Sequence, residues 1–232
     1  MPDTATIIIS AAATLGCAAF ARLFLGACFA GDHRRAFRVK GLAGLCFVAV
    51  GLLMALRCGK LSFAVPVAAG LVLGLAGDQL LALRFILKEK HDLMFISGAV
   101  AFSMGHALYI LALLRLTGGM RPAALIALWL AGAAAAVVYA RIRRTNAGKL
   151  NGGCCVYIAL VTLMCAVACA AAIKAPGAAT LMFAAGGVCF VVSDNVLTAY
   201  CFGNRKTPGM NRTIHITYYL AQLLIAWSLA FV

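Results

Sequence analysis

The sequence predicts an all-α, polytopic membrane bundle of eight transmembrane helices. Of its 232 residues, 65% are hydrophobic and only 11% are charged, whereas soluble domains carry about 25% charged residues. Apolar runs close to the roughly 20 residues that span a bilayer recur along the chain. No long polar block interrupts them. We therefore expect residues 1–232 to form a single integral membrane domain, without a separate soluble domain.

The eight spans are expected at about residues 5–29, 41–56, 62–83, 93–114, 122–140, 154–173, 178–202 and 214–231. Glycine, proline or basic residues separate each run from the next, as is typical of turns between helices. The second run is short, and we expect it to continue through Arg57.

Basic residues are concentrated in alternate loops of this plan. The loops after the first, third, fifth and seventh spans carry Arg34, Arg35, Arg38, Lys40, Arg84, Lys88, Lys90, Arg141, Arg143, Arg144, Lys149, Arg205, Lys206 and Arg212. The opposite side carries Arg57, Lys60, Arg115, Arg121 and Lys174. By the positive-inside rule, we expect the first set of loops in the cytosol and both termini outside, in a protein of the plasma membrane.

The net charge of +14 has a simple explanation in such a protein. Basic loops lie against anionic lipid headgroups, so we expect the bilayer and not nucleic acid as the partner. The ten cysteines lie almost entirely in apolar runs and form no CxxC pair. We interpret them as small packing residues, not as disulfides or zinc ligands.

Two aspartates lie inside the predicted spans, which is costly. An acidic side chain at the centre of a membrane helix costs roughly 2.5–3.5 kcal/mol on insertion scales. Asp194 lies in the middle of the seventh span, and Asp78 lies near the end of the third, beside a face of small residues that includes Gly74 and Gly77. We predict that Asp78 points into the bundle, and we interpret the two aspartates as the working centre.

The fourth and eighth spans carry polar faces that a lipid environment would penalise. In the fourth span, His106 and Tyr109 share a face with Gly98, Phe102 and Gly105. His106 fits equally well as a satisfied interior histidine or as a participant in chemistry.

In the eighth span, a polar stripe must face protein or water. Its members follow the i, i+3, i+4, i+7 spacing of one helix face: His215, Tyr218, Tyr219 and Gln222. Hydrogen bonds between helices are the alternative use for this stripe. Tyr139 and Tyr157 are interpreted as interfacial aromatics without a chemical role.

Short similarities between the two halves of the sequence indicate a possible parallel repeat of four helices. Gly77-Asp78-Gln79 resembles Ser193-Asp194-Asn195, and His106-Ala107-Leu108-Tyr109 resembles His215-Ile216-Thr217-Tyr218. At a rise of about 1.5 Å per residue, Asp78, Asp194, Tyr218 and Gln222 lie at overlapping depths on the side of the basic loops, and His106 lies deeper. The sequence thus permits one polar pocket that opens toward the cytosol, if spans three, seven and eight meet.

These motifs together resemble the YhhN-like family, the lysoplasmalogenase family of eight-span membrane proteins. The similarity rests on the order and spacing of Gly77-Asp78, Phe102-x-x-Gly105-His106-x-x-Tyr109, Ser193-Asp194 and Tyr218-Tyr219-x-Ala221-Gln222, and runs from about residue 37 to the C-terminus. Lys40-Gly41 departs from the Lys-Pro that is usual in the family.

The resemblance implies hydrolysis of the vinyl-ether bond of a lysoplasmalogen-like lysophospholipid, which yields a fatty aldehyde and a glycerophospho-base. It also implies that Asp78 and Asp194 are the active-site residues. Vinyl-ether cleavage requires a proton donor and an anion near the oxocarbenium ion, and two carboxylates can supply both. We expect Asp194, the more deeply buried, to be the acid, and Asp78 to stabilise charge and activate water, with the reverse assignment left open.

The remaining polar residues are expected to bind substrate or to support the aspartates: His106, Tyr109, Ser193, His215, Tyr218, Tyr219 and Gln222. The basic loops would receive the phosphate of the headgroup, and the single chain would lie between helices. We expect no cofactor. A zinc ion bound by Asp78, His106, Asp194 and His215 is the alternative, although His106 and His215 differ in depth and no HxxxH or HExxH pair exists.

A different class of function also fits intramembrane aspartates on a repeated scaffold. Proton-coupled transporters of small molecules or lipids use acidic residues in this setting. A purely structural membrane protein is a third interpretation, which the cost of two buried aspartates disfavours.

Overall fold

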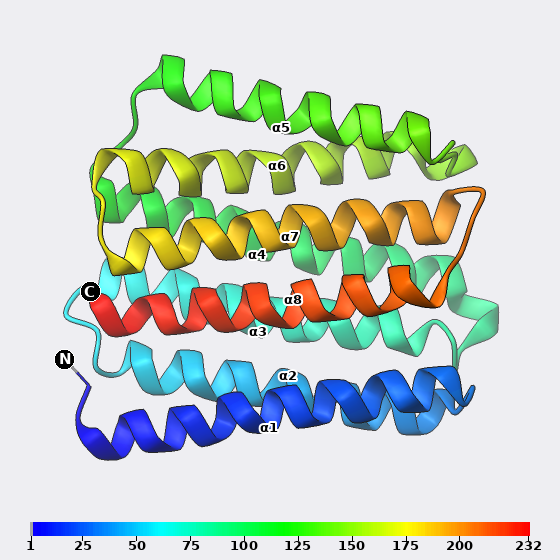
Figure 1. The fold of residues 1–232 in the computed structure, drawn as a ribbon, viewed down its shortest axis with the longest axis horizontal. Helices are drawn as coiled ribbons and strands as arrows, with labels where there is room; N and C mark the ends of the chain where they lie inside the picture. The colour runs from blue at the N-terminus through cyan, green and yellow to red at the C-terminus, as the bar shows by residue number, and fades with distance from the viewer. Residues whose placement is uncertain (1) are drawn as a thin grey trace.

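The computed structural model describes residues 2–232 and consists of eight antiparallel membrane-length helices (Figure 1). They are α1 (Thr4–Phe29), α2 (His33–Ala55), α3 (Leu61–Leu83), α4 (His91–Thr117), α5 (Pro122–Ile142), α6 (Asn151–Lys174), α7 (Ala178–Phe202) and α8 (Pro208–Ser228). Three short 3₁₀ turns, Lys88–Lys90, Gly148–Leu150 and Leu229–Phe231, adjoin them, and residues 2–232 contain no strand. Each helix is long and apolar enough to cross a membrane. The predicted fold class is confirmed.

The loops divide between the two ends of the bundle as the charge pattern requires. Figure 1 shows the two termini at one end and the loops after α1, α3, α5 and α7 at the other. The second end is therefore the one that carries most of the basic residues. All ten cysteines are free; Cys17 is buried, Cys155 is exposed and the others are half-buried.

Two helices begin well before the predicted spans because their first turns are polar. α2 begins at His33, where the Asp32 carboxylate accepts a hydrogen bond from the backbone N–H of Arg35 at 2.9 Å. α8 begins at Pro208 after the Thr207 cap. The expectation that the second helix continues through Arg57 is wrong, because α2 ends at Ala55.

Close approach of α3 and α4 depends on the small residues of both helices. A Cβ atom on Gly77 would lie 2.8 Å from the Phe102 ring and 3.0 Å from the carbonyl oxygen of Gly98. A Cβ atom on Gly105 would lie 3.2 Å from the carbonyl oxygen of Gly70. The small face predicted on the third span is therefore a helix contact, and it places the Asp78 side chain inside the bundle, 3% exposed.

The arrangement of the helices agrees with the predicted repeat, in which α4 corresponds to α8 and α6 to α2. α4 packs against α6, and α8 likewise packs against α2. The match is incomplete at the edges, since α1 contacts α8 whereas α5 packs mainly on α6. α5 lies at the margin of the bundle in Figure 1, and Ala136 is its only buried residue.

We predict that Gly77→Ala lowers the free energy of unfolding by about 1–3 kcal/mol, because the backbone oxygen of Gly98 cannot move aside as a side chain would. SDS-driven unfolding in mixed micelles measures this change. Gly26→Ala is the matched control, since no atom lies within 4 Å of a Cβ atom there. Equal stability of the two variants would show that the α3–α4 contact is looser than described.

Candidate active site

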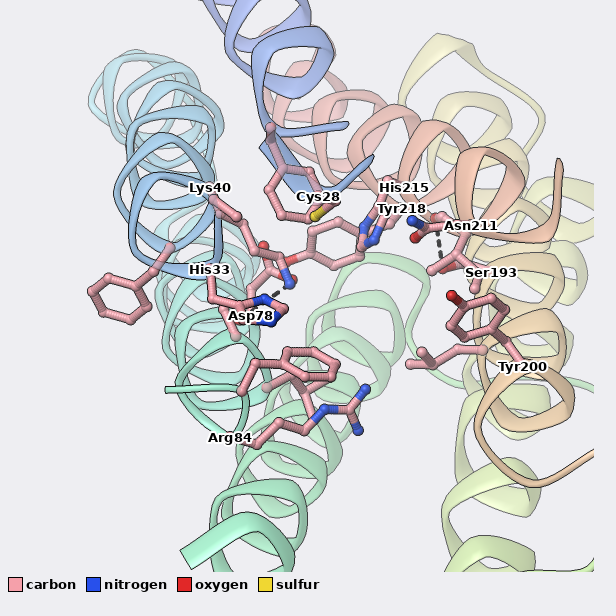
Figure 2. A pocket seen from close by; sticks show the side chains of 18 of the residues that line it. Cys28, His33, Lys40, Asp78, Arg84, Ser193, Tyr200, Asn211, His215 and Tyr218 are labelled. Carbon is pink, nitrogen blue, oxygen red and sulfur yellow. Dashed lines mark hydrogen bonds and ion pairs between the residues drawn. The ribbon is translucent and has the colours of Figure 1, made fainter. Parts of the chain in front are cut away.

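A central cavity of about 200 Å³ lies between α1, α2, α3, α4, α7 and α8 near the basic end of the bundle. Both Asp78 and Asp194 line it, so residues on helices that do not directly adjoin in sequence reach one space. In Figure 2, Lys40, Asp78 and Arg84 lie on one side of this space and Ser193 and Tyr200 on the other. α8 contributes His215 and Tyr218 to the wall and packs against both α3 and α7.

Asp78 is held in a buried ion pair. The Lys40 ammonium lies 2.7 Å from Asp78 Oδ1 and also donates to the Asp78 backbone carbonyl at 3.2 Å. The two residues are only 4% and 3% exposed. The prediction that Lys40 lies in a loop is wrong, because the early start of α2 places it inside the helix. The pair keeps two charges in an apolar bundle by making each the partner of the other.

Asp194 is 5% exposed, so the expectation that it is more deeply buried than Asp78 is wrong, and it has different partners. The Tyr157 hydroxyl donates a hydrogen bond to Asp194 Oδ2 at 2.7 Å. His106 Nε2 lies 3.8 Å from the same oxygen. The imidazole is 1% exposed and forms no hydrogen bond, and the Phe190 ring meets it edge-on at 5.0 Å. Asp194 thus faces a neutral donor and a histidine where Asp78 faces a lysine.

Lys40 and Tyr157 occupy corresponding places in the two halves of the chain. Lys40 lies on α2 and reaches an aspartate on α3, whereas Tyr157 lies on α6 and reaches an aspartate on α7. Nearly the same number of residues separates Lys40 from Tyr157 as separates Asp78 from Asp194. In each half, the helix that precedes the aspartate therefore supplies its side-chain partner.

Other predicted residues divide into cavity wall and interior support. Ser193, His215 and Tyr218 line the cavity, whereas His106, Tyr109, Tyr219 and Gln222 do not. Ser193 Oγ donates to the Ile214 carbonyl at 3.0 Å and joins α7 to α8. The His215 ring packs against Phe24, with ring centroids 4.6 Å apart.

A chain of hydrogen bonds closes the inner side of the cavity. The Tyr109 hydroxyl donates to Gln222 Oε1 at 2.9 Å, Gln222 Nε2 donates to the Tyr218 hydroxyl at 3.2 Å, and Tyr218 donates to the Gly74 carbonyl at 3.1 Å. This network ties α4, α8 and α3 together. The polar stripe of α8 therefore includes the helix-joining hydrogen bonds that were the alternative to a chemical role.

Two buried oxygens beside the ion pair have no hydrogen-bond partner. They are Asp78 Oδ2 and the hydroxyl oxygen of Tyr219, and these two side chains lie next to each other. Buried polar atoms are normally satisfied by protein or water. The Tyr219 hydroxyl is therefore a donor within the protein that can satisfy this oxygen of Asp78.

Sequence reasoning missed Lys40, Tyr157 and Arg84 as site residues. The hydropathy pattern assigns Lys40 and Arg84 to loops, but they are buried at 4% and 6% exposure. A signal for Lys40 was present, because it continues the buried helical face of Ala36, Ala43 and Phe47. No comparable signal distinguished Tyr157 from Tyr139. Residues 2–232 contain no group of three or more His, Cys, Asp or Glu side chains placed to hold a metal ion.

A family model described as the YhhN family matches residues 35–229 of the chain. The match includes Lys40, Asp78, Tyr157 and Asp194 and leaves out all of α1. No solved structure matches the chain.

We predict that Lys40→Met and Asp78→Asn are each strongly destabilising, by about 3–5 kcal/mol, because each leaves its partner's charge buried and unpaired. The double variant Lys40→Met/Asp78→Asn removes both charges and is expected to recover much of the loss. SDS-driven unfolding of the four proteins measures the coupling. Additive losses in the double variant would show that the pair is not coupled.

Proposed function

Because the chain belongs to the YhhN family, we propose that it is an intramembrane hydrolase that cleaves the vinyl-ether bond of lysoplasmalogen-like lysophospholipids. The products are a fatty aldehyde and a glycerophospho-base. The observation that carries the proposal is the pair of aspartates on one cavity with unlike partners, Lys40 for Asp78 and Tyr157 for Asp194. Unlike environments separate the roles of two carboxyl groups.

In the first step, the Asp194 carboxylic acid transfers its proton to the β-carbon of the vinyl ether. The double-bond electrons form the new C–H bond, and the ether oxygen shares a lone pair with the α-carbon to give an oxocarbenium ion. Tyr157 donates to Asp194 Oδ2, which leaves Oδ1 as the oxygen that carries the proton. The Lys40 ammonium favours the ionised form of Asp78, so this carboxylate is the anion that stabilises the cation.

In the second step, Asp78 takes a proton from water while the water oxygen attacks the oxocarbenium carbon, and a hemiacetal forms. In the third step, Asp194 takes the proton of the hemiacetal hydroxyl, the bond from that carbon to the glycerol oxygen breaks, and Asp78 returns its proton to the glycerol oxygen. Both carboxyl groups regain their starting states, so the cycle consumes only water and needs no cofactor.

The supporting residues keep this arrangement in place. His106 Nε2 lies 3.8 Å from Asp194 Oδ2, and the Tyr109–Gln222–Tyr218 network holds the three helices around the cavity. The cavity lies near the basic loops, which we infer to be cytosolic in a plasma-membrane protein whose termini lie outside. The substrate would therefore enter from the cytoplasmic leaflet.

We predict that Asp194→Asn lowers aldehyde release from lysoplasmalogen at least about 100-fold, because an amide cannot supply the proton. The measurement is the rate of aldehyde formation by purified protein. The amide oxygen introduced by this substitution can still accept the Tyr157 hydrogen bond, so the variant should fold. Asp78→Asn is the weaker test, because it leaves the buried Lys40 charge unpaired and so also lowers stability.

Asp92→Asn is the control, because the Asp92 side chain is 81% exposed and lies outside the cavity. Wild-type rates in Asp194→Asn would reject the paired-carboxyl mechanism. Proton flux into proteoliposomes that depends on Asp194, without aldehyde release by the parent protein, would establish the transporter alternative.

A further inference from the structure

A second, apolar hollow of about 340 Å³ adjoins the central cavity; we call it the α4–α6 groove. Residues of α4, α6 and α7 line it, and Leu81, Phe102 and Leu197 line both spaces. Its rim includes Val100 and Val156, which are 53% and 71% exposed on the surface that faces lipid. The groove therefore offers a lateral path from the bilayer to the wall of the central cavity.

Arg84 is a buried cation without an acidic partner. The residue is 6% exposed and lines the central cavity, and Figure 2 shows its guanidinium directed away from α3 into that space. Its Nε atom has no hydrogen-bond partner, and Nη2 has only the Cys201 sulfur at 3.6 Å. Within residues 2–232, no carboxylate lies within 4.0 Å of it.

The surroundings of Arg84 favour a cation but do not neutralise it. The guanidinium carbon lies 4.7 Å from the ring centroid of Phe85 and 5.2 Å from that of Phe95. Such contacts orient an arginine and recover part of its desolvation cost. A buried charge without a counterion remains expensive, and a planar guanidinium suits a phosphate oxygen pair. Lys40, the other buried cation of this cavity, already has Asp78.

Arg84 also stands at the junction of the two spaces. Phe95 and Cys201, its neighbours, both line the α4–α6 groove, whereas Arg84 itself lines the central cavity. Tyr157 lines the groove and donates to Asp194, which lines the cavity. An anionic group at Arg84 and a chain in the groove can thus belong to one molecule whose glycerol end lies beside Asp194.

We propose that Arg84 binds the phosphate of a single-chain phospholipid and that the α4–α6 groove holds the hydrocarbon chain of the same molecule. The choice of a lysophospholipid as the ligand rests on the proposed function. In this arrangement, the bond between the chain and the glycerol lies where Tyr157 meets Asp194. The occupant is a lysophospholipid from the bilayer, and a water-soluble phosphate compound is the competing source of the anion.

The test measures binding, by intrinsic fluorescence or calorimetry of the detergent-purified protein, with three probes that cannot be hydrolysed at a vinyl ether. They are a saturated 1-O-alkyl lysophosphatidylcholine, a 1-O-alkylglycerol with the same chain, and glycerophosphocholine. Arg84→Met should weaken lysophospholipid binding about tenfold or more, the scale of one lost charge-assisted contact, and should leave alkylglycerol binding unchanged. Arg34→Met, at an exposed arginine outside the cavity, is the control.

Adjacent glycines provide a matched pair for the groove. A Cβ atom has no neighbour within 4 Å at either Gly152 or Gly153, but only Gly153 lines the groove. Gly153→Leu should weaken binding of both chain-bearing probes several-fold, whereas Gly152→Leu should bind as the parent does. Glycerophosphocholine should bind far more weakly than the lysophospholipid and should be insensitive to Gly153→Leu.

A stability measurement separates ligand binding from a structural role. Loss of an unpaired buried charge should leave the melting temperature of Arg84→Met unchanged or higher, so a large decrease would overturn the proposal. The proposal would also be overturned if Arg84→Met bound the lysophospholipid as tightly as the parent does. The same holds if Gly153→Leu bound both chain-bearing probes as tightly as the parent does. Arg84-dependent binding in a protein that releases no aldehyde would uphold this inference and reject the proposed hydrolysis.

Discussion

The ion pair between Lys40 and Asp78 is the contact on which the site depends. In an apolar bundle, neither charge is tolerated without the other, and their separation of 2.7 Å fixes α2 against α3 at the depth of the cavity. The close glycine contacts of α3 with α4 then set the position of the next wall. The ion pair is therefore a structural connection between α2 and α3 inside the membrane.

The two aspartates occupy corresponding places in the two halves of the chain but have different partners. α3 and α7 present corresponding carboxyl groups, and α2 and α6 each send one side chain to them. A lysine supplies a full positive charge, whereas a tyrosine supplies only a neutral hydrogen bond. In the function that we propose, this difference makes Asp78 the anion and Asp194 the acid.

Some polar side chains of this bundle form hydrogen bonds that join helices, and others face the cavity. Tyr109, Gln222 and Tyr218 satisfy one another and the Gly74 carbonyl, as buried polar groups must in a membrane. Arg84 and His106 are two of the exceptions, because each is buried with ring or guanidinium nitrogens that lack partners. Unsatisfied groups cost stability, and both lie beside the space in which we propose that the lipid is bound and cleaved.

The sequence by itself determined the eight spans, the concentration of basic loops at one end and the choice of Asp78 and Asp194, because long apolar runs and charges within them are local signals. It also predicted the small face of α3 through the spacing of Gly70 and Gly77, and the structure showed that α4 packs there. Only the tertiary structure decided which side chains meet those aspartates. Lys40 lies in a polar first turn that hydropathy assigns to a loop, and Tyr157 resembles an interfacial aromatic until α6 packs beside α7. The partners come from other helices, so lateral packing, which leaves no pattern along the chain, decides which side chain meets each carboxyl group.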